Sequence, residues 1–229
     1  MLNNRSNGAV LRLPRSLPRG RNALPRDIVL VSQSERLLQA IVEVVAENGY
    51  AATRVADIVA RAGVSRGTFY QQFRDKEDCF MAAFMDGSRR LFEAAEASGV
   101  EETDPLLRLR RSIRGYLAML ASEPAWSRAF LVDIRSVSAA ETQRAEVHGW
   151  YVDLVRRWRR WAITSLGDSS IPESAYEACV DAENELVARH VERGAFADLA
   201  SLEDSMVYIH LALLGFPKQA AAIPGGERR

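Results

Sequence analysis

Cysteine and histidine are scarce in this chain of 229 residues, which has two cysteines and three histidines. Cys79 and Cys179 lie far apart, and neither stands at metal-ligand spacing from His148, His190 or His210. This pattern argues against a disulfide framework and against a zinc site, and it suits a reducing cytoplasm. We therefore expect no metal and no cofactor, and we expect the histidines to lie at the surface or at an interface.

Long apolar runs and an excess of one charge are also missing. No stretch approaches the ~18–20 apolar residues that a membrane span requires, and the Arg- and Pro-rich N-terminus lacks the apolar segment of a signal peptide. Lys and Arg total 30 and Asp and Glu total 30, so the net charge is zero and only the placement of charge can indicate a nucleic-acid partner. We expect a cytoplasmic protein with no membrane partner.

Helical periodicity covers nearly all of the chain after residue 32, and no run has the pattern of a strand. The sequence predicts an all-α fold with an N-terminal three-helix domain and a larger helical domain. The expected helices span residues 32–48, 53–62, 65–73, 75–97, 105–123, 124–134, 138–166, 172–194 and 202–214.

Capping residues set the expected helix starts. Ser32 and Glu35 have the spacing of a capping box, while Thr53, Ser65 and Asp75 each precede a helical pattern as an N-cap. Before them, residues 1–31 are rich in Arg and Pro and are expected to form a flexible basic arm. Such an arm is either a passive tail or adds phosphate and minor-groove contacts.

The stretch AGVSRGTFYQQF, residues 62–73, predicts a short helix anchored on one side. Val64 and Phe69 have the spacing of a hydrophobic staple, and Phe69 and Phe73 share one buried face. Two short helices joined by a turn at Gly63 and Val64 are typical of a helix-turn-helix motif, whose second helix enters the DNA major groove.

The outer faces of this motif carry side chains suited to DNA. Hydroxyls contact phosphates, amides pair with adenine, guanidinium groups pair with guanine, a glycine lets the backbone approach closely, and helix N-termini hold phosphates. The candidate DNA contacts are Thr53, Arg54, Ser65, Arg66, Gly67, Thr68, Tyr70, Gln71, Gln72 and Lys76.

The run TRVADIVARAGVSRGTFYQQFRDKEDCF, residues 53–80, resembles the DNA-binding domain of the tetracycline-repressor (TetR) family of bacterial transcription regulators. The resemblance covers roughly residues 33–80. One departure is Gln72, where members often have Tyr or His, which bears on operator preference. The resemblance implies a homodimer held by an intermolecular bundle of its last two long helices, and middle helices that enclose a pocket for a small-molecule effector.

On this basis the expected domains are residues 32–85 for DNA binding and 86–216 for ligand binding and dimerisation, followed by a disordered tail, 217–229. Small and aliphatic residues suit the dimer bundle, namely Ala178, Ala182, Leu186, Val187, Leu211 and Leu214. The Arg cluster at 156–160 is interpreted as a solvated face. The candidate ligand-binding residues are Tyr116, Met119, Trp126, Phe130, Trp150 and Glu183.

The function predicted is that of a sequence-specific transcription regulator, most simply a repressor released from a palindromic DNA operator by its effector. Two alternatives stay open at this point. One is an all-helical ligand-binding protein or enzyme with an incidental helix-turn-helix, although no nucleophile–base pair, carboxylate pair or metal cluster has a recognisable spacing. The other is a ligand-free DNA-binding adaptor. DNA binding, and its loss on ligand addition, separate the three.

Overall fold

Helices make up all the regular structure in the residues that the computed structural model describes, 26–167 and 169–224. None of the helices in these ranges combines the length and the apolar character needed to span a bilayer. The α-helices are α1 (Arg26–Asn48), α2 (Val55–Ala62), α3 (Arg66–Gln72), α4 (Lys76–Ser98), α5 (Pro105–Ser122), α6 (Pro124–Leu131), α7 (Glu141–Leu166), α8 (Ser174–Glu192), α9 (Glu203–Leu213) and α10 (Pro217–Ala221), and the 3-10 helices are η1 (Asp133–Ser136), η2 (Ser138–Ala140) and η3 (Phe196–Leu202).

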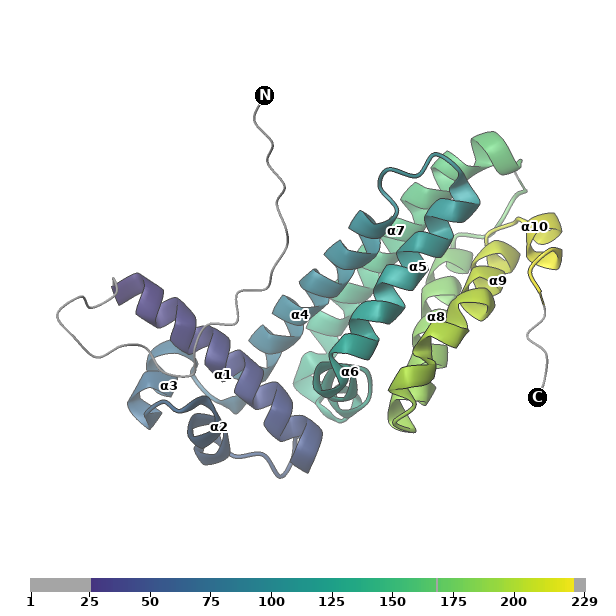
Figure 1. Cartoon of the computed structure of the whole chain (residues 1–229). Coiled ribbons are helices and arrows are strands. Elements are labelled where there is room, and N and C mark those ends of the chain that lie inside the picture. Colours follow the sequence, from purple (N-terminus) through teal and green to yellow (C-terminus); the bar gives the residue numbers. More distant parts are fainter. Residues whose placement is uncertain (1–25, 168, 225–229) are drawn as a thin grey trace.

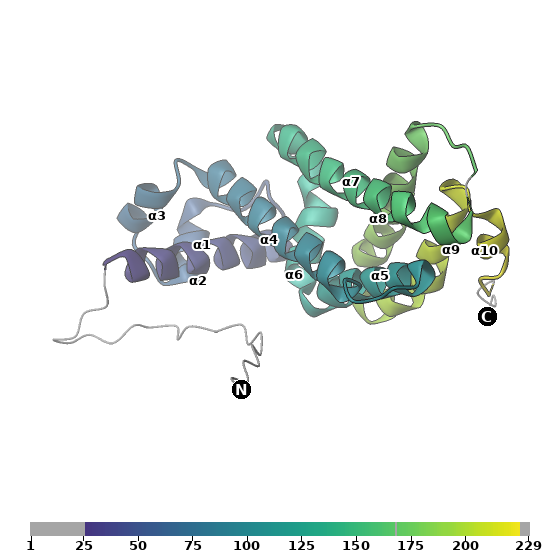
Figure 2. The same ribbon diagram turned by 90° about the horizontal axis from the view of Figure 1, so that it is seen from above.

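The molecule has two lobes joined by one long helix. Helices α1, α2 and α3 form a head at one end, and α5 to α10 form a body at the other (Figure 1). Helix α4 starts beside the head and runs on into the body, where it lies alongside α5 and α7. The view from above shows the same division (Figure 2). This arrangement confirms an all-helical protein with a small N-terminal helical unit.

A single apolar core continues from the head into the body. Ile41, Ile58 and Phe69 are fully buried within the head. Phe80, on the first turns of α4, is also fully buried, and its ring centroid lies 4.8 Å from that of Tyr50 and 4.7 Å from that of Phe130 on α6. Aromatic pairs at this separation contribute beyond the area they bury. The two lobes are therefore packed against each other through Phe80.

The first helix begins six residues before the expected start. Helix α1 starts at Arg26, and Ser32 lies buried inside it, so the predicted capping box of Ser32 and Glu35 is wrong. The early turns are held by α3, because the Gln72 side-chain amide donates a hydrogen bond to the Leu30 carbonyl oxygen at 3.2 Å. Residues 26–31 therefore belong to the head, and the rest of the predicted arm lies outside the described residues.

The N-cap of α2 is Arg54, so the predicted cap by Thr53 is wrong. Thr53 is buried, and its hydroxyl donates to the Gly49 carbonyl oxygen at 2.9 Å. The Asp57 carboxylate instead accepts a hydrogen bond from the Arg54 backbone N–H at 3.0 Å. Thr53 therefore stabilises the turn after α1, where its methyl group is buried and its hydroxyl has a hydrogen-bond partner.

Two further boundaries differ from the prediction. The segment after α6 turns through η1 and η2 before α7 begins, and Ile134 in η1 and Val137 between the two are buried. At the C-terminal end, Pro217 starts α10 where a disordered tail was expected, because proline is well suited to the first helical position. Ala220 is buried there, and the Gln219 amide donates to the Leu166 carbonyl oxygen at 3.2 Å.

Candidate DNA-binding surface and effector pocket

The turn between α2 and α3 has the geometry that the sequence predicted. Gly63 adopts a left-handed backbone conformation with φ of 64°, which only glycine takes without strain. The Ser65 side chain then caps α3 by accepting a hydrogen bond from the Thr68 N–H at 3.0 Å. Phe69 and Phe73 are buried with ring centroids 5.8 Å apart. These contacts fix the direction of α3 relative to the rest of the head.

The opposite side of α3 is open to solvent. Tyr70 is 58% exposed, and Arg66, Gly67 and Gln71 are also exposed. Arg54, at the start of α2, is exposed as well. Thr68 is half-buried, with its hydroxyl 2.9 Å from that of Ser65. The head thus presents the phenol, amide and guanidinium groups expected of a helix that reads DNA.

Three of the candidate DNA contacts point elsewhere. Besides Thr53 and Gln72, described above, Lys76 turns toward the loop after α1. Its Nζ donates to the carbonyl oxygens of Tyr50 and Thr53 at 2.8 and 3.0 Å, and burial lowers its pKa. The side chains of Thr53, Gln72 and Lys76 therefore hold the head together, and a DNA role for them stays a prediction.

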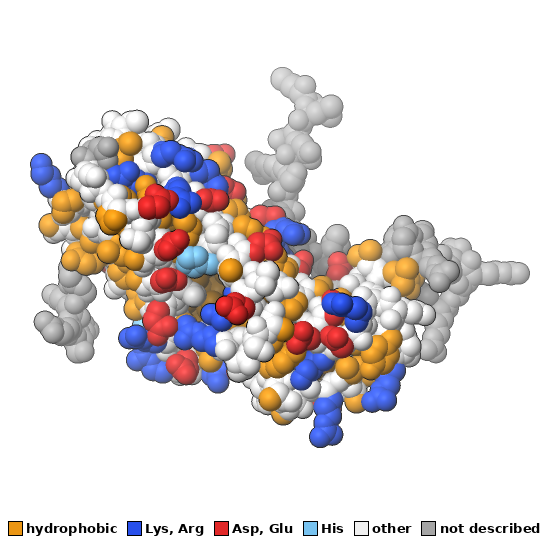
Figure 3. All heavy atoms as spheres, turned by 180° about the vertical axis from the view of Figure 1, so that it is seen from behind, with side chains coloured by type: hydrophobic (Ala, Val, Ile, Leu, Met, Phe, Trp, Pro, Cys, Tyr) orange, Lys and Arg blue, Asp and Glu red, His pale blue; other side chains and the backbone are white. Residues whose placement is uncertain are grey.

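Charge on the head is mixed, and two of its basic side chains, Arg61 and Arg74, are paired with acidic neighbours. Arg61 on α2 is paired with Glu43 and Glu47 of α1 at 3.0 and 2.6 Å, which ties the two helices together. Arg74 makes a longer ion pair, at 3.4 Å, with Asp78, and its side chain is more exposed than that of Arg61. Figure 3 shows acidic and basic side chains interspersed over this face of the molecule, with basic ones projecting at the lower edge of the head.

A cavity of about 690 Å³ lies in the body, enclosed by helices α4 to α9. This volume is within the range of about 300–1,000 Å³ that is common for small-molecule sites. Its walls are mainly apolar and aromatic, and Arg108, Arg144 and Arg157 stand among the lining residues. Arg108 lies over the Trp161 ring at 5.2 Å, and Arg157 pairs with Glu96 at 2.9 Å.

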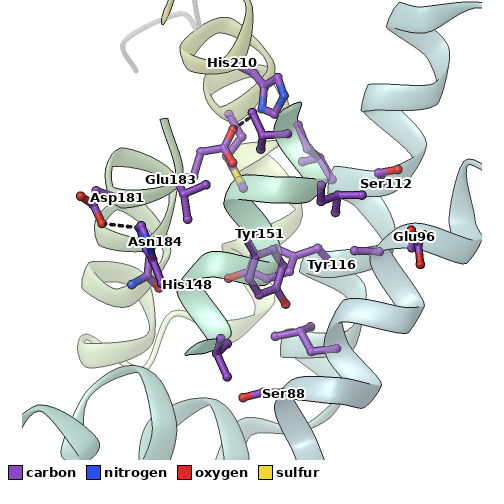
Figure 4. Close-up of a pocket in the computed structure, with 18 of the residues that line it drawn as sticks. Ser88, Glu96, Ser112, Tyr116, His148, Tyr151, Asp181, Glu183, Asn184 and His210 are labelled. Carbon is purple, nitrogen blue, oxygen red and sulfur yellow. Dashed lines mark hydrogen bonds and ion pairs between the residues drawn. The ribbon is translucent and has the colours of Figure 1, made fainter. Parts of the chain in front are cut away.

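Two tyrosines stand in the middle of the pocket. Tyr116 of α5 and Tyr151 of α7 meet edge to face with ring centroids 6.0 Å apart (Figure 4). Burial raises the pKa of both phenols, and the charge of Glu183 adds to the effect on Tyr116. Among the described residues, Tyr151 Oη, Ser88 Oγ, Trp126 Nε1 and His210 Nε2 are buried without a hydrogen-bond partner. All four line this cavity, and such groups are suited to a bound polar molecule.

The pocket contains four of the six predicted ligand-binding residues: Tyr116, Trp126, Phe130 and Glu183. Met119 and Trp150 are not among the lining residues, and a ligand contact for them stays a prediction. Met119 packs against the core, and Trp150 meets Phe92 at a centroid distance of 6.1 Å outside the lining. Helix periodicity finds an apolar face but does not say which neighbour that face meets.

The histidines are more deeply placed than the sequence indicated. His210 is buried, and its Nδ1 lies 3.0 Å from a Glu183 carboxylate oxygen, so Glu183 is not solvated (Figure 4). His148 lines the pocket with its Nε2 3.0 Å from Asp181 Oδ1. Cys179 also reaches His210, with Sγ 3.5 Å from Nδ1. The expectation that no cysteine and histidine share a cluster is therefore wrong.

Arg159 is a further exception to the predicted solvated face. It is buried, and it donates to the carbonyl oxygens of Leu214 and Ser169 at 3.0 and 2.7 Å. Arg156, Arg157 and Arg160 lie on the more open sides of α7. Arg159 thus connects α7 to the end of α9.

The outer faces of α8 and α9 include apolar residues. Tyr208 and Leu213 on α9 are 52% and 38% exposed. Ala178 is exposed, and Ala182 and Leu186 are half-buried. Val187, Leu211 and Leu214 are fully buried within the chain, so the prediction that they contact a partner subunit is wrong.

The packed, capped and outward-facing α3 following α2 defines a helix-turn-helix DNA-binding head on an all-helical body. Residues 37–83 match the family described as bacterial regulatory proteins, tetR family. This part of the chain, which holds the helix-turn-helix, is therefore a match to that family's DNA-binding region.

Curated relatives match the N-terminal part of the chain. The fatty acid metabolism regulator protein of Bacillus subtilis (strain 168) is 33% identical over 88 residues, which cover 38% of this chain and 45% of that protein. The HTH-type transcriptional activator FasR of Mycolicibacterium smegmatis is 32% identical over 95 residues, or 42% of each chain. The chain thus spans less than half the length of these two relatives.

Solved structures extend the likeness to most of the fold. The fatty acid degradation regulator FadR from Bacillus halodurans has a TM-score of 0.71 and 23% identity, covering 86% of this chain and 97% of that one. FadR from Bacillus subtilis in complex with stearoyl-CoA has a TM-score of 0.67 and 24% identity, covering 79% and 97%. At these identities the likeness shows the fold alone.

Proposed function

We propose that this chain is a transcription regulator that binds a palindromic DNA operator as a homodimer and leaves it when a small-molecule effector fills the pocket. One observation carries the proposal. Helix α4 belongs to both parts, because its first residues support the head while Ser88, Leu91 and Ala95, further along, line the cavity. A ligand that displaces α4 therefore acts directly on the head.

Helix α6 gives a second connection between pocket and head. Its Trp126 and Phe130 line the cavity, and the Phe130 ring packs in a tilted arrangement against Phe80 and Phe84 of α4, with centroids 4.7 and 5.4 Å apart. Helix α6 also packs against α1 of the head. Because packed interfaces shift between discrete arrangements, a ligand between α4 and α6 favours one tilt of the head over another.

The homodimer is proposed to form through the outer faces of α8 and α9. Tyr208 and Leu213 supply exposed apolar surface there, and aromatic residues are enriched at such interfaces. A two-fold dimer places two α3 helices in successive major grooves, about 34–36 Å or somewhat more apart. The operator is then an inverted repeat.

The effector is proposed to be a long-chain fatty acyl thioester of coenzyme A. The apolar and aromatic walls suit an acyl chain, and Arg108 and Arg144 suit the phosphates of a nucleotide headgroup. The similarity to the fatty acid metabolism regulator protein of Bacillus subtilis, and to the FadR structure in complex with stearoyl-CoA, supports an effector of this class.

DNA binding is tested by fluorescence anisotropy on the intergenic DNA upstream of the chain's own gene, against a scrambled duplex of equal length. Salt is held at about 150 mM, because weaker salt favours non-specific binding. We expect preference for the native fragment, saturating at two chains per site. Two results together contradict the proposal: equal weak binding to both duplexes, and no preferred sequence recovered when the protein selects from a pool of random duplexes.

The effector is tested by adding stearoyl-CoA, stearate or free coenzyme A to the preformed DNA complex. We expect release by stearoyl-CoA, weaker release by stearate and none by coenzyme A. Arg144→Ala should weaken the response to stearoyl-CoA and leave that to stearate unchanged. Arg160→Ala is the matched control, because Arg160 is exposed on the same helix and does not line the cavity. An equal response of both variants contradicts the headgroup assignment.

A further inference from the structure

Three side chains with metal-binding atoms converge at one wall of the pocket. Cys179 and Glu183 lie one turn apart on α8, and His210 comes from α9. The His210 Nδ1 atom is 3.0 Å from Glu183 Oε1 and 3.5 Å from Cys179 Sγ, and the sulfur is 4.0 Å from the same carboxylate oxygen. Cys179 and His210 are buried, and the Glu183 side chain is 14% exposed.

This arrangement does not suit a cysteine nucleophile activated by histidine. In such a triad the imidazole uses one ring nitrogen for the nucleophile and the other for the carboxylate that orients it. Here the thiol and the carboxylate both approach Nδ1. In the part of the chain that the structure describes, Nε2 is buried and has no hydrogen-bond partner. The three donor atoms surround a common point instead of forming a relay.

The separations of the donor atoms are close to those around a tetrahedral ion. With metal–sulfur bonds near 2.3 Å and metal–nitrogen or metal–oxygen bonds near 2.0–2.1 Å, ligand atoms lie about 3.3–3.6 Å apart. The observed separations of 3.0, 3.5 and 4.0 Å lie on either side of these values. Movements of a few tenths of an ångström would bring the three atoms to bonding distance.

Charge balance also fits a divalent cation. A thiolate, a carboxylate and a neutral imidazole carry two negative charges, so a divalent ion makes the site neutral, and a buried neutral site avoids the cost of an uncompensated charge. Soft sulfur with imidazole and carboxylate is a donor set for zinc-like ions and is unsuited to magnesium or calcium.

We propose that Cys179, Glu183 and His210 form a binding site for a thiophilic divalent cation such as Zn²⁺. Glu183 and His210 line the cavity (Figure 4), whereas Cys179 is fully buried and is not among the lining residues. A fourth coordination position on the side of Glu183 and His210 therefore faces the pocket. Water or an oxygen of the effector takes that position. The cation bridges α8 and α9 and adds a polar anchor to a mostly apolar cavity.

Binding includes an acid–base step. The sulfur binds a cation as a thiolate, so the Cys179 thiol has to lose its proton. The S–H bond then breaks as the metal–sulfur bond forms, and one proton from Cys179 passes to solvent for each cation bound. No oxidant or reductant is needed.

The test is a titration of the full chain, purified without a polyhistidine tag and stripped of metal, with Co²⁺ followed by Zn²⁺. We expect a thiolate-to-cobalt charge-transfer band and strong visible bands at one cation per chain, both lost when Zn²⁺ displaces Co²⁺. A wild-type chain that shows no charge-transfer band overturns the proposal, whatever the variants do.

Variants then locate the thiolate. Cys179→Ser should abolish the charge-transfer band, and Glu183→Gln should weaken Co²⁺ binding at least tenfold while keeping a hydrogen bond to His210. Cys79→Ser is the matched control, because Cys79 is the other buried cysteine and its Sγ faces a backbone carbonyl of α1. A band that persists in Cys179→Ser, or that disappears in Cys79→Ser, overturns the assignment. Circular dichroism shows that each variant has kept its helices.

Discussion

The ammonium group of Lys76 lies 4.1 Å above the ring centroid of Tyr50 and donates to the Tyr50 carbonyl oxygen at 2.8 Å. This relationship ties the start of α4 to the loop between α1 and α2. The sequence predicted that Lys76 contacts DNA. In the structure its side chain is held by two carbonyl oxygens and an aromatic ring, so it stabilises the position of the head.

Lys76→Met is expected to destabilise the protein by about 1–3 kcal/mol, because it leaves the Tyr50 and Thr53 carbonyl oxygens without their donor. DNA binding should weaken equally on all sequences as the head loosens. Urea unfolding and anisotropy measure the two effects. Wild-type stability together with lost DNA affinity would instead show that Lys76 contacts phosphate directly.

Tyr70→Ala is expected to weaken operator binding about tenfold or more with unfolding free energy changed by less than about 0.5 kcal/mol, because the side chain is exposed. Tyr70→Phe keeps the ring and removes the hydroxyl. A phosphate hydrogen bond predicts that both variants lose affinity on every duplex. If Tyr70→Phe binds as wild type, the hydroxyl makes no such contact.

Gly87→Ala is expected to destabilise the body by about 1–3 kcal/mol, as overpacking does. A methyl group on Gly87 of α4 would stand 1.8 Å from the Trp126 Nε1 atom at the pocket wall. Gly149→Ala is the matched control, because a methyl group on Gly149 would have no described atom within 4 Å. This substitution should be neutral or should stabilise the protein by up to ~1 kcal/mol. Equal thermal shifts for the two variants would contradict the packing.

Acid sensitivity is expected from Glu203 at the start of α9. Hydrogen bonds from Arg114 and then Arg110 hold its pKa below the usual value, although burial opposes them. A lowered folded-state pKa stabilises the protein above the unfolded value of about 4.3 and ceases to do so as pH falls through the folded value. Glu203→Gln should therefore cost stability at pH 7, and this cost should shrink as the pH falls below the unfolded value.

Urea midpoints measured across this pH range test the assignment. Glu146→Gln is the control, since Glu146 is exposed on α7 and is expected to change stability little at any pH. A Glu203→Gln difference that does not shrink on acidification would show that packing, not charge, dominates at this position.

The proposed dimer face is tested by Tyr208→Glu, which puts a charge on the exposed side of α9. We expect dissociation to monomers and loss of operator affinity, with the pocket still competent for ligand. Val100→Glu is the control, because Val100 is similarly exposed, at 59%, in the turn after α4. Sedimentation velocity distinguishes the outcomes, and an intact Tyr208→Glu dimer would place the interface elsewhere.

The head could be predicted from the sequence because its signals are local. The Gly63 turn, the Ser65 cap and the spacing of Phe69 and Phe73 all lie within eleven consecutive positions. The caps assigned to Ser32 and Thr53 failed where burial mattered more than local pattern. Both hydroxyl residues lie inside the fold, where the neighbouring helices decide their partners.

The pocket was harder to predict from the sequence because its lining residues come from six helices, α4 to α9. Trp126 and Phe130 follow from an amphipathic α6, but Trp150 and Tyr151 are adjacent and only the second faces the cavity. The rotation of α7 about its axis decides between them, and no local signal reports it. The meeting of Cys179 with His210 depends in the same way on how α8 lies against α9.

Phe80 packs against rings from both lobes, which has a consequence for how a displacement passes between them. Tilted aromatic rings of Tyr50, Phe80 and Phe130 fill the junction between the lobes, so we expect the head and the start of α4 to move as one piece. A helix of 23 residues is about 35 Å long and acts as a stiff lever. If the proposed effector displaces the pocket end of α4, we expect the head to move with it, because a stiff helix transmits a displacement along its length.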